Sequence, residues 1–385
     1  MTQRKPVADQ TGTADRAADG AGAARPGAGM AADIAEQPAG YARLLQPAYA
    51  EPIAEVAAAI AGRRPRHVVF TARGTSDHAA LYAAYLSEIR LGLPAGLASP
   101  SAVTLFGARP DLRDALVVGV SQSGGSPDLA EVLAVAREQG ALTVAVTNTP
   151  ESPLAAAAEL TVDIAAGHER AVAATKTYTA ELLALLMLVE GIRAGDGVLP
   201  PDERAALDAL PALADRVLAD PTAAELAPRY RFAARLVTTG RGYGYPTARE
   251  TALKLMETSY LPALAFSGAD LLHGPLAMTD PDVPVLAVVG SGPGGTAMRD
   301  VLRRLGERRA DVLAIGAGAG AIGTGPTGPA AVTGPAAVIG VPDVDERYAP
   351  LLDILPAQQL ALALALARGE DPDAPRGLAK VTSTR

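Results

Sequence analysis

Short apolar runs alternate with longer segments of helical periodicity, and this alternation constrains the fold of the chain more than any other feature. In the first half, runs rich in Val and Leu lie at residues 67–72, 115–121, 142–148 and 160–164. A strand that is apolar along its whole length is buried on both faces of its sheet. Such strands, separated by helices, predict an α/β fold in which helices cover both sides of a parallel sheet.

The same pattern begins again in the second half of the chain. After a helical linker over 194–225, apolar runs expected to be strands lie at residues 232–240, 283–290, 310–317 and 336–342. The similar order of strands and helices in the two halves indicates a pseudo-repeat. We therefore predict two tandem domains followed by a tail, with boundaries at 34–210, 211–368 and 369–385.

Two segments lack this periodicity. Residues 1–33 are polar and rich in Ala and Gly, so we predict a disordered extension there. Met30 is an alternative start, because residues 31–45 after it look like an amphipathic opening helix. Residues 316–335 are rich in Gly and Pro, and we expect a mobile loop without chemistry. The first 30 residues lack the apolar core of a signal peptide.

Composition excludes several classes of function. The 385 residues include no Cys, which rules out disulfides, thiolate metal sites and a cysteine nucleophile. The net charge of −8 argues against a nucleic-acid-binding surface, and the four scattered histidines lack the spacing of metal ligands. The most apolar stretches are too short or too interrupted by charge to span a bilayer. We expect a cytoplasmic protein that binds neither nucleic acid nor membrane and holds no metal.

The stretch SQSGGSPD follows the apolar run at 115–121 and precedes a predicted helix. Ligands of open α/β sheets bind beyond the carboxyl ends of the strands, where the start of a helix presents free N–H groups and a positive dipole end to an anion. Ser126 or Asp128 alone is explained as a helix N-cap, but capping does not require four polar donors in six residues. We therefore favour an anion site whose donors are Ser121, Gln122, Ser123 and Ser126.

A second polar turn follows the run at 67–72. Thr75 and Ser76 stand there at the predicted start of the next helix, although an N-cap explains Ser76 equally well. Two such turns in one sheet converge on one crevice. Neither contains a lysine, and the chain has no G-x-x-x-x-G-K-[ST] motif, so a sugar phosphomonoester is a more natural ligand than a nucleoside triphosphate.

The segment GSGPGG, residues 290–295, matches the G-x-G-x-x-G pattern of dinucleotide-binding turns. The next predicted strand ends in Gly and Ala, where a ribose-binding Asp or Glu is required. We therefore reject a nicotinamide cofactor and interpret the segment as a glycine-rich turn.

A later segment combines carboxylates, a lysine and a histidine. Glu250, Lys254 and Glu257 share one face of a predicted helix, a spacing that is also common in solvated salt-bridge stripes. The flanks here are apolar, however, and lead to a lone His273. A carboxylate and a histidine beside a sugar phosphate can move protons between adjacent carbons and open a ring. Lys380 in the tail is by itself an ordinary surface lysine.

Six motifs of the chain, in this order, resemble the sugar isomerase (SIS) superfamily: GTS, SQSGGSPD, ERAVAATKTYTAELLALLML, RETALKLMETSY, HGPLAM and PRGLAK. The chain looks most like the isomerase half of glucosamine–fructose-6-phosphate aminotransferases and their stand-alone relatives. The resemblance runs from about residue 34 to residue 385. It implies two SIS domains, each with a flavodoxin-like, five-stranded parallel sheet flanked by helices, in a homodimer.

The resemblance also implies roles for individual residues. Glu257 matches the base that moves a proton between C1 and C2, with Lys254 and Glu250 supporting it. His273 matches the ring-opening histidine, which the partner subunit supplies, and Lys380 matches a tail lysine that can form an imine with the open ketose. The implied binders of phosphate and sugar are Ser76, Ser121, Gln122, Ser123 and Ser126, and Val172 lines the site.

The chain also departs from the aminotransferases. It lacks their glutaminase half, Ala174 replaces a serine of their VASTK motif, and GADLLHGP replaces GELKHGP. These features look more like the deaminases of the superfamily. We therefore expect a cofactor-independent conversion of glucosamine 6-phosphate to fructose 6-phosphate and ammonia. Galactosamine 6-phosphate deamination or isomerisation, fructosamine 6-phosphate deglycation and non-catalytic sugar-phosphate sensing stay open as alternatives.

Overall fold

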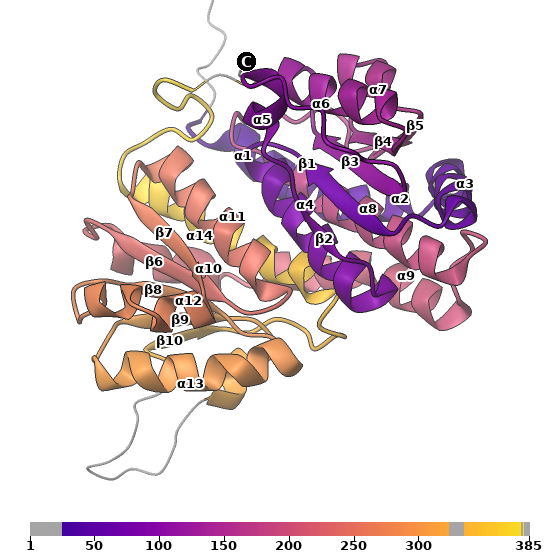
Figure 1. Cartoon of the computed structure of the whole chain (residues 1–385). Helices are drawn as coiled ribbons and strands as arrows, with labels where there is room; N and C mark the ends of the chain where they lie inside the picture. The colour runs from indigo at the N-terminus through magenta and orange to yellow at the C-terminus, as the bar shows by residue number, and fades with distance from the viewer. Residues whose placement is uncertain (1–24, 323–334, 379, 381–385) are drawn as a thin grey trace, which may run out of the picture.

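Two parallel sheets form the framework of the computed structural model, which describes residues 25–322, 335–378 and 380 (Figure 1). The first sheet has the order β2-β1-β3-β4-β5. Its strands are β1 (His67–Thr71), β2 (Ala95–Leu97), β3 (Ala115–Ser121), β4 (Leu142–Thr147) and β5 (Leu160–Asp163). The register pairs Thr71 with Gly119, so the carboxyl ends of β1 and β3 lie at the same edge of the sheet.

Helices cover both faces of the first sheet. One face packs against α3 (Pro47–Arg63), α4 (Thr75–Leu86) and α8 (Lys176–Ala194), and the other against α6 (Pro127–Glu138) and α7 (Pro153–Ala157). Alternate residues of β3 pack on opposite faces of the sheet. Leu116 and Val118 belong to the core beneath α8, whereas Val117 belongs to the core beneath α6. The short α5 (Pro100–Thr104) packs on α6, and a π-helix, η1 (Ser87–Leu91), continues α4.

The second sheet repeats this plan with the order β10-β9-β8-β6-β7. Its strands are β6 (Leu236–Gly240), β7 (Ala263–Ser267), β8 (Val285–Val288), β9 (Val312–Ile315) and β10 (Ala337–Ile339). One face packs against α11 (Gly244–Ser259) and α14 (Ala349–Ala367), and the other against α12 (Gly268–Leu272) and α13 (Pro293–Glu307). The predicted fold class, two five-stranded parallel sheets flanked by helices, is confirmed.

Two strands have no counterpart among the predicted ones. Both β2 and β7 are edge strands with partly exposed side chains. Strand β2 has only three residues, too few to form an apolar run, whereas β7 contains the short apolar run ALAF at 263–266, which the prediction overlooked. The strand expected at 232–240 is also shorter, because β6 begins at Leu236 after a 3-10 helix, η2 (Ala227–Tyr230), and a turn.

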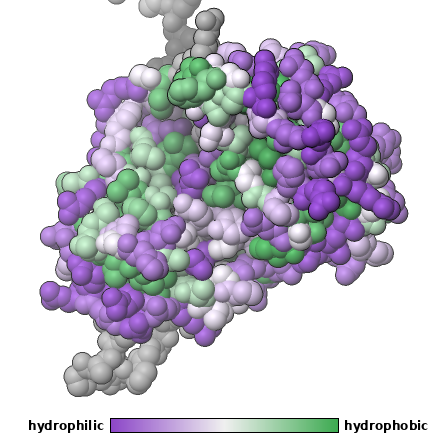
Figure 2. All heavy atoms as spheres, in the orientation of Figure 1, coloured by the Kyte–Doolittle hydropathy of each residue, from purple (hydrophilic) through white to green (hydrophobic). Residues whose placement is uncertain are grey.

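The two domains share one continuous core. The linker is helical as predicted, with α9 (Pro201–Leu218) and α10 (Thr222–Leu226), and the predicted boundary at residue 210 falls inside α9. Helix α14 contacts α8, α9 and α11, so it joins elements of both domains. The expectation that the most apolar stretches are too short or too charged to span a bilayer is wrong for α14, which is long and apolar enough to cross a membrane. However, 78% of its most apolar window is buried inside the molecule, as in a core helix. Hydrophilic side chains cover the exposed face of α13, and apolar ones gather toward the middle of the view (Figure 2).

The predicted disordered extension over 1–33 is wrong for its last residues. Helix α1 (Ala28–Ala35) and helix α2 (Gln37–Leu44) lie at the start of the described chain, and Met30 and Asp33 are fully buried. Carboxylates of the C-terminal segment cap α1, since the N–H of Gly27 donates to Asp371 and that of Gly29 to Asp373. Helical structure is as expected over 31–45, but the residues that cap α1 lie more than 300 positions away, so its start at Ala28 was not predicted. Residues 1–24 lie outside the described residues.

The predicted mobile loop over 316–335 lies mostly outside the described residues, which omit 323–334. Its first part contains a 3-10 helix, η4 (Ala319–Ile322), that follows β9.

Candidate functional site

A cavity of about 320 Å³ lies beyond the carboxyl ends of β1 and β3. Five segments form its wall: the two turns that follow these strands, the loop before α8, the last turns of α11 and the C-terminal tail. The lining residues are Arg73, Gly74, Thr75, Ser76, Ser121, Gln122, Ser123, Ser126, Val172, Ala174, Glu257, Leu378 and Lys380.

The turn after β3 presents backbone and hydroxyl groups to this cavity. The buried Ser121 shapes the turn, since its Oγ accepts the N–H of Gly124 at 3.1 Å. Gly124 has a φ of +59°, and a Cβ there would lie 2.0 Å from Ser152 Oγ, so only glycine fits. Ser126 is the N-cap residue of α6, but its side chain makes no capping bond. Its hydroxyl is therefore free for a ligand at the positive end of the helix.

The turn after β1 adds a positive charge that the sequence analysis missed. Arg73 lines the cavity, and its Nε donates to Asp128 Oδ2 at 2.9 Å. Asp128 is buried within the first turn of α6, so this ion pair ties the two turns together. The side chain of Arg73 is 49% exposed, and its guanidinium can donate to an anion in the cavity.

Helix α11 brings the three predicted charged residues to the cavity floor. Lys254 Nζ lies 2.5 Å from Glu257 Oε2 and 3.3 Å from Glu250 Oε1, and it also donates to Thr75 Oγ1 at 3.1 Å. Lys254 and Glu250 are fully buried, which does not fit a solvated salt-bridge stripe. Glu257 is partly exposed and lines the cavity. The helix therefore presents one carboxylate to the cavity and holds it with a buried lysine.

The charges of this group stabilise one another. Burial lowers the pKa of Lys254, but the carboxylates of Glu250 and Glu257 outweigh it and hold the pKa above its ordinary value. Burial raises the pKa of Glu250, but Lys254 and His78 outweigh it and hold the pKa below its ordinary value. His78 Nδ1 lies 2.7 Å from Glu250 Oε2. Lys254 therefore stays a cation at neutral pH.

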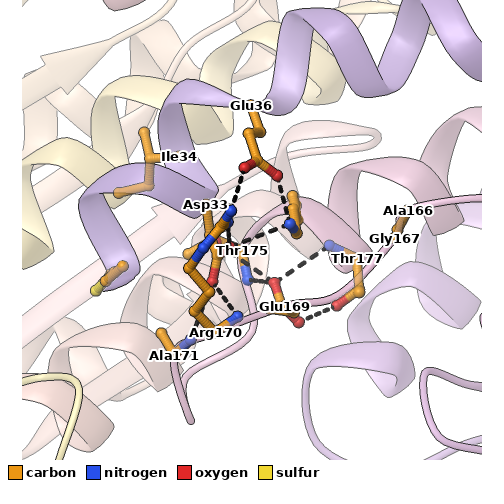
Figure 3. Close-up of polar contacts among 12 residues, drawn as sticks. Asp33, Ile34, Glu36, Ala166, Gly167, Glu169, Arg170, Ala171, Thr175 and Thr177 are labelled. Atoms are coloured by element: carbon orange, nitrogen blue, oxygen red, sulfur yellow. Dashed lines mark hydrogen bonds and ion pairs between the residues drawn. The ribbon is translucent and has the colours of Figure 1, made fainter. Parts of the chain in front are cut away.

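The loop before α8 forms the opposite wall of the cavity and is held by buried carboxylates. Figure 3 shows Glu169 pointing toward Thr175 and Thr177, whose backbone N–H groups donate to Glu169 Oε1 at 2.6 Å and 3.3 Å. The Thr177 hydroxyl donates to Glu169 Oε2. These bonds fix the start of α8 and the preceding residues, which include Val172 and Ala174 of the cavity wall.

Asp33 of α1 clamps the same loop from the other side (Figure 3). Its Oδ2 accepts the backbone N–H groups of Arg170 at 2.6 Å and Ala171 at 2.9 Å, and Lys176 Nζ lies 3.1 Å from its Oδ1. Glu36 pairs with both Arg170 and Lys176. The N-terminal helix therefore positions the backbone immediately before Val172.

Lys380 reaches the same loop from the tail. Its Nζ donates to the carbonyl oxygen of Ala171 and lies 3.5 Å from Glu169 Oε2. The tail is also held at Tyr260, whose hydroxyl accepts the N–H of Arg376 at 2.7 Å. Lys380 thus lines the cavity while the described part of the tail is anchored on both domains.

Eight of the eleven predicted site residues line this one cavity, namely Ser76, Ser121, Gln122, Ser123, Ser126, Val172, Glu257 and Lys380. Lys254 and Glu250 lie beneath its floor. His273 is not among the lining residues; it is exposed, just after α12. Its predicted role across a subunit interface stays a prediction.

The sequence analysis missed Arg73, Asp33 and Glu169. Arg73 lies in the turn after β1, close to Thr75 and Ser76, and its position beside these two hydroxyl residues was an available signal. Asp33 acts on a distant segment, and no local pattern marks it. Glu169 is the first residue of the motif ERAVAATKTYTAELLALLML, but nothing in that motif indicates its bonds to backbone N–H groups. Within the described residues, no group of three or more His, Asp or Glu side chains is arranged to hold a metal ion.

Comparisons with known proteins agree with this architecture. The model of the SIS domain matches residues 63–191 and 230–322. The glutamine–fructose-6-phosphate aminotransferase of Gloeobacter violaceus is 35% identical over 322 residues, which make up 81% of this chain and 51% of that protein. The chain therefore spans about half the length of this curated relative.

Solved structures share the fold over most of the chain. A candidate phosphosugar isomerase from Silicibacter pomeroyi DSS-3 superposes with a TM-score of 0.77 at 34% identity, over 90% of this chain and 99% of that one. The glucosamine-6-phosphate deaminase of Thermotoga maritima superposes with a TM-score of 0.69 at 20% identity, over 92% of this chain and 100% of that one. Two parallel five-stranded sheets, the matched segments and this likeness together show that the chain belongs to the SIS domain family.

Proposed function

We propose that the protein is a phosphosugar isomerase that acts as a deaminase on glucosamine 6-phosphate. The observation that carries the proposal is the position of Glu257. Its carboxylate, held by buried Lys254, faces the same cavity as the donor-rich turn after β3. A base and an anion site therefore share one cavity large enough for a sugar phosphate.

The turn after β3 binds the phosphate in this proposal. The free N–H groups at the start of α6, the hydroxyls of Ser123 and Ser126 and the guanidinium of Arg73 are donors on one side of the cavity. Charge-assisted hydrogen bonds of this kind contribute about 1.5–3 kcal/mol each. The phosphate is thereby fixed at one end, and the chain of carbons extends toward Glu257.

Glu257 then moves one proton along the open-chain sugar. It removes the proton from C2, which the neighbouring aldehyde acidifies, while O1 takes up a proton from solvent, so that an enolamine forms. It then returns its proton to C1 while the nitrogen releases one N–H proton to solvent, so that the 2-amino group becomes an imine. Water adds to the imine carbon and ammonia leaves, which yields fructose 6-phosphate. Each step uses only the substrate, water and side chains of the protein.

Two further residues have proposed roles at this site. His273, exposed after α12, assists ring opening in the cavity of a partner subunit of a homodimer. Lys380, at the cavity wall, closes the site over the sugar and can form an imine with the open ketose. The Thermotoga maritima protein of the same fold is a glucosamine-6-phosphate deaminase, and this likeness supports the choice of an amino sugar.

Ammonia release from glucosamine 6-phosphate tests the proposal, with fructose 6-phosphate measured as the second product. We expect Glu257→Gln to lower turnover by about 1,000-fold, the scale of a lost general base, while fructose 6-phosphate still binds in calorimetry. Glu131→Gln, on the exposed face of α6, is the matched control and retains activity. Full turnover by Glu257→Gln would overturn the proposal.

The same assay separates the alternatives. Turnover of galactosamine 6-phosphate or a fructosamine 6-phosphate, without turnover of glucosamine 6-phosphate, would replace the substrate but keep the mechanism. Tight binding of sugar phosphates without turnover of any of them would instead favour a sensor.

A further inference from the structure

Glu181 of α8 is a buried carboxyl group that the mechanism above does not use. Its side chain is 1% exposed, and its Oε1 lies 2.8 Å from the Oγ of Ser76, which lines the cavity. Its other oxygen, Oε2, is buried without a hydrogen-bond partner. Glu181 therefore reaches the cavity only through the hydroxyl of Ser76.

The groups around Glu181 do not supply a positive charge to it. From the loop before α8, Glu169 faces it but accepts bonds from threonines and pairs with Lys380. From α11, Glu250 faces it but is already paired with Lys254 and His78. Tyr178, on α8 itself, has a buried hydroxyl without a partner. Glu181 is the carboxyl group of this cluster that has a hydroxyl but no cation beside it.

This environment favours the neutral acid. Burial raises the pKa of Glu181 to about 8, and the nearby charges of Glu169 and Glu250 act in the same direction, while the bond with Ser76 opposes them. At pH 7 the side chain is mainly a carboxylic acid, which has one O–H to donate.

We propose that Glu181 is a positioning residue that, as a neutral acid, donates to Ser76 Oγ and leaves the Ser76 hydroxyl hydrogen free to bind an anionic ligand in the cavity. A serine hydroxyl has a single hydrogen to donate. When Glu181 ionises, the carboxylate takes that hydrogen, and Ser76 then presents only lone pairs to the ligand. The new negative charge also repels a phosphate. The ligand class, a sugar phosphate, rests on the proposed function.

The sign of the pH dependence follows from this exchange. The pKa of Glu181 is raised, so the donor form is present below about pH 8 and is lost as the pH rises through that value. Ligand affinity is therefore high at pH 7 and falls above pH 8. By linkage, a bound anion stabilises the protonated form and raises the pKa of Glu181 further.

Binding of fructose 6-phosphate to the full chain, measured by calorimetry from pH 7 to pH 9.5, tests this inference. The ligand has no amino group, and its phosphate is already a dianion over this range because the second pKa of phosphate esters is about 6. We expect wild-type affinity to fall about 10-fold, the scale of one charge-assisted hydrogen bond. We expect Glu181→Gln, whose amide donates at every pH, to bind with a constant affinity close to the wild-type value at pH 7.

Ser76→Ala provides a second variant that does not change α8. It should bind more weakly at pH 7 and keep only the part of the decline that comes from the charge of ionised Glu181. A flat wild-type profile, or an unchanged decline in either Glu181→Gln or Ser76→Ala, would overturn the inference and leave the proposed function intact. Absence of binding at every pH would overturn the proposed function and this inference with it.

Discussion

The two domains carry related turns in related places, but only the first leaves its turn open to a ligand. The turn of residues 121–126 connects β3 to α6, and the turn of residues 290–295 connects β8 to α13. Both are rich in Ser and Gly, and both lead into a helix that begins at a proline. The first turn lines the cavity, whereas the second holds the carboxylate of Glu346.

Glu346 occupies the place where an anion would bind the second turn. Its two oxygens accept the N–H groups of Gly294 at 3.0 Å and Gly295 at 2.9 Å. A Cβ on Gly292 or Gly294 would lie 2.6 Å from these oxygens, so the glycines make room for this side chain. The pattern G-x-G-x-x-G here accommodates a carboxylate of the chain itself. The positive end of a helix can therefore bind a carboxylate of the same chain, as α13 does. Of these two turns, only the one at 121–126 stays available to an external anion.

The largest expected effect comes from placing a carboxylate in the first turn, where it would occupy the anion site as Glu346 does in the second turn. Ser126→Asp places a carboxylate at the start of α6, where aspartate is a favourable N-cap, so the fold should be preserved. Two like charges about 4 Å apart repel by about 4 kcal/mol at the effective dielectric of a protein surface. We expect the affinity for fructose 6-phosphate to fall at least 100-fold in calorimetry. The neutral isostere Ser126→Asn should lose far less, and equal losses in the two variants would refute the charge argument.

A smaller effect is expected from weakening the contacts between Asp33 and the loop before α8, which forms the cavity wall opposite the first turn. Asp33→Asn keeps an oxygen near the N–H groups of Arg170 and Ala171 but removes the charge that pairs with Lys176. We expect KM for glucosamine 6-phosphate to rise about 10-fold, because Val172 is then less well positioned, while kcat changes less. Breaking a buried pair also lowers the free energy of unfolding by about 3 kcal/mol.

The matched control for this clamp is Glu307→Gln, an exposed residue of α13. It should change neither KM nor stability measurably. A fall in kcat for Asp33→Asn without any rise in KM would contradict a positioning role.

Removing the Glu346 carboxylate from the second turn should lower the free energy of unfolding and leave catalysis nearly unchanged. In Glu346→Ala, the N–H groups of Gly294 and Gly295 lose their acceptor, which costs about 1–3 kcal/mol of unfolding free energy. Thermal denaturation should therefore begin at a lower temperature, and added sulfate should restore part of the loss by replacing the carboxylate. We expect kcat/KM at 25 °C to stay within about 2-fold of wild type, since the turn is far from the reaction in this account. Wild-type thermal stability in Glu346→Ala would show that the carboxylate does not satisfy the turn.

The smallest effect is expected for Ser291→Ala. The Ser291 hydroxyl donates to the exposed Asp343 at 2.6 Å, outside the cavity. An exposed bond of this kind contributes less than about 1 kcal/mol. Activity and stability should both match wild type in the same assays, whereas Ser123→Ala in the first turn should weaken fructose 6-phosphate binding about 10-fold. Equal effects of the two serines on binding would break the comparison between the turns.

The sequence allowed the framework of the fold to be predicted because the central strands are apolar along their whole length. The edge strands β2 (Ala95–Leu97) and β7 (Ala263–Ser267) escaped prediction because their apolar runs are shorter than that of a central strand such as β3. The turn at 121–126 was also predictable, since its donors are adjacent in the sequence. Asp33 and Glu346 were not, because each acts on backbone N–H groups of another segment, and backbone groups leave no trace in the composition.

A crystal structure of the protein with bound fructose 6-phosphate tests the central claim most directly. We predict that the phosphate lies against Ser123, Ser126 and the N–H groups at the start of α6, with C1 and C2 beside Glu257. We also predict that Glu346 still fills the turn at 290–295. A sugar phosphate in the second turn, or a first turn left empty while the ligand binds elsewhere, would contradict the account.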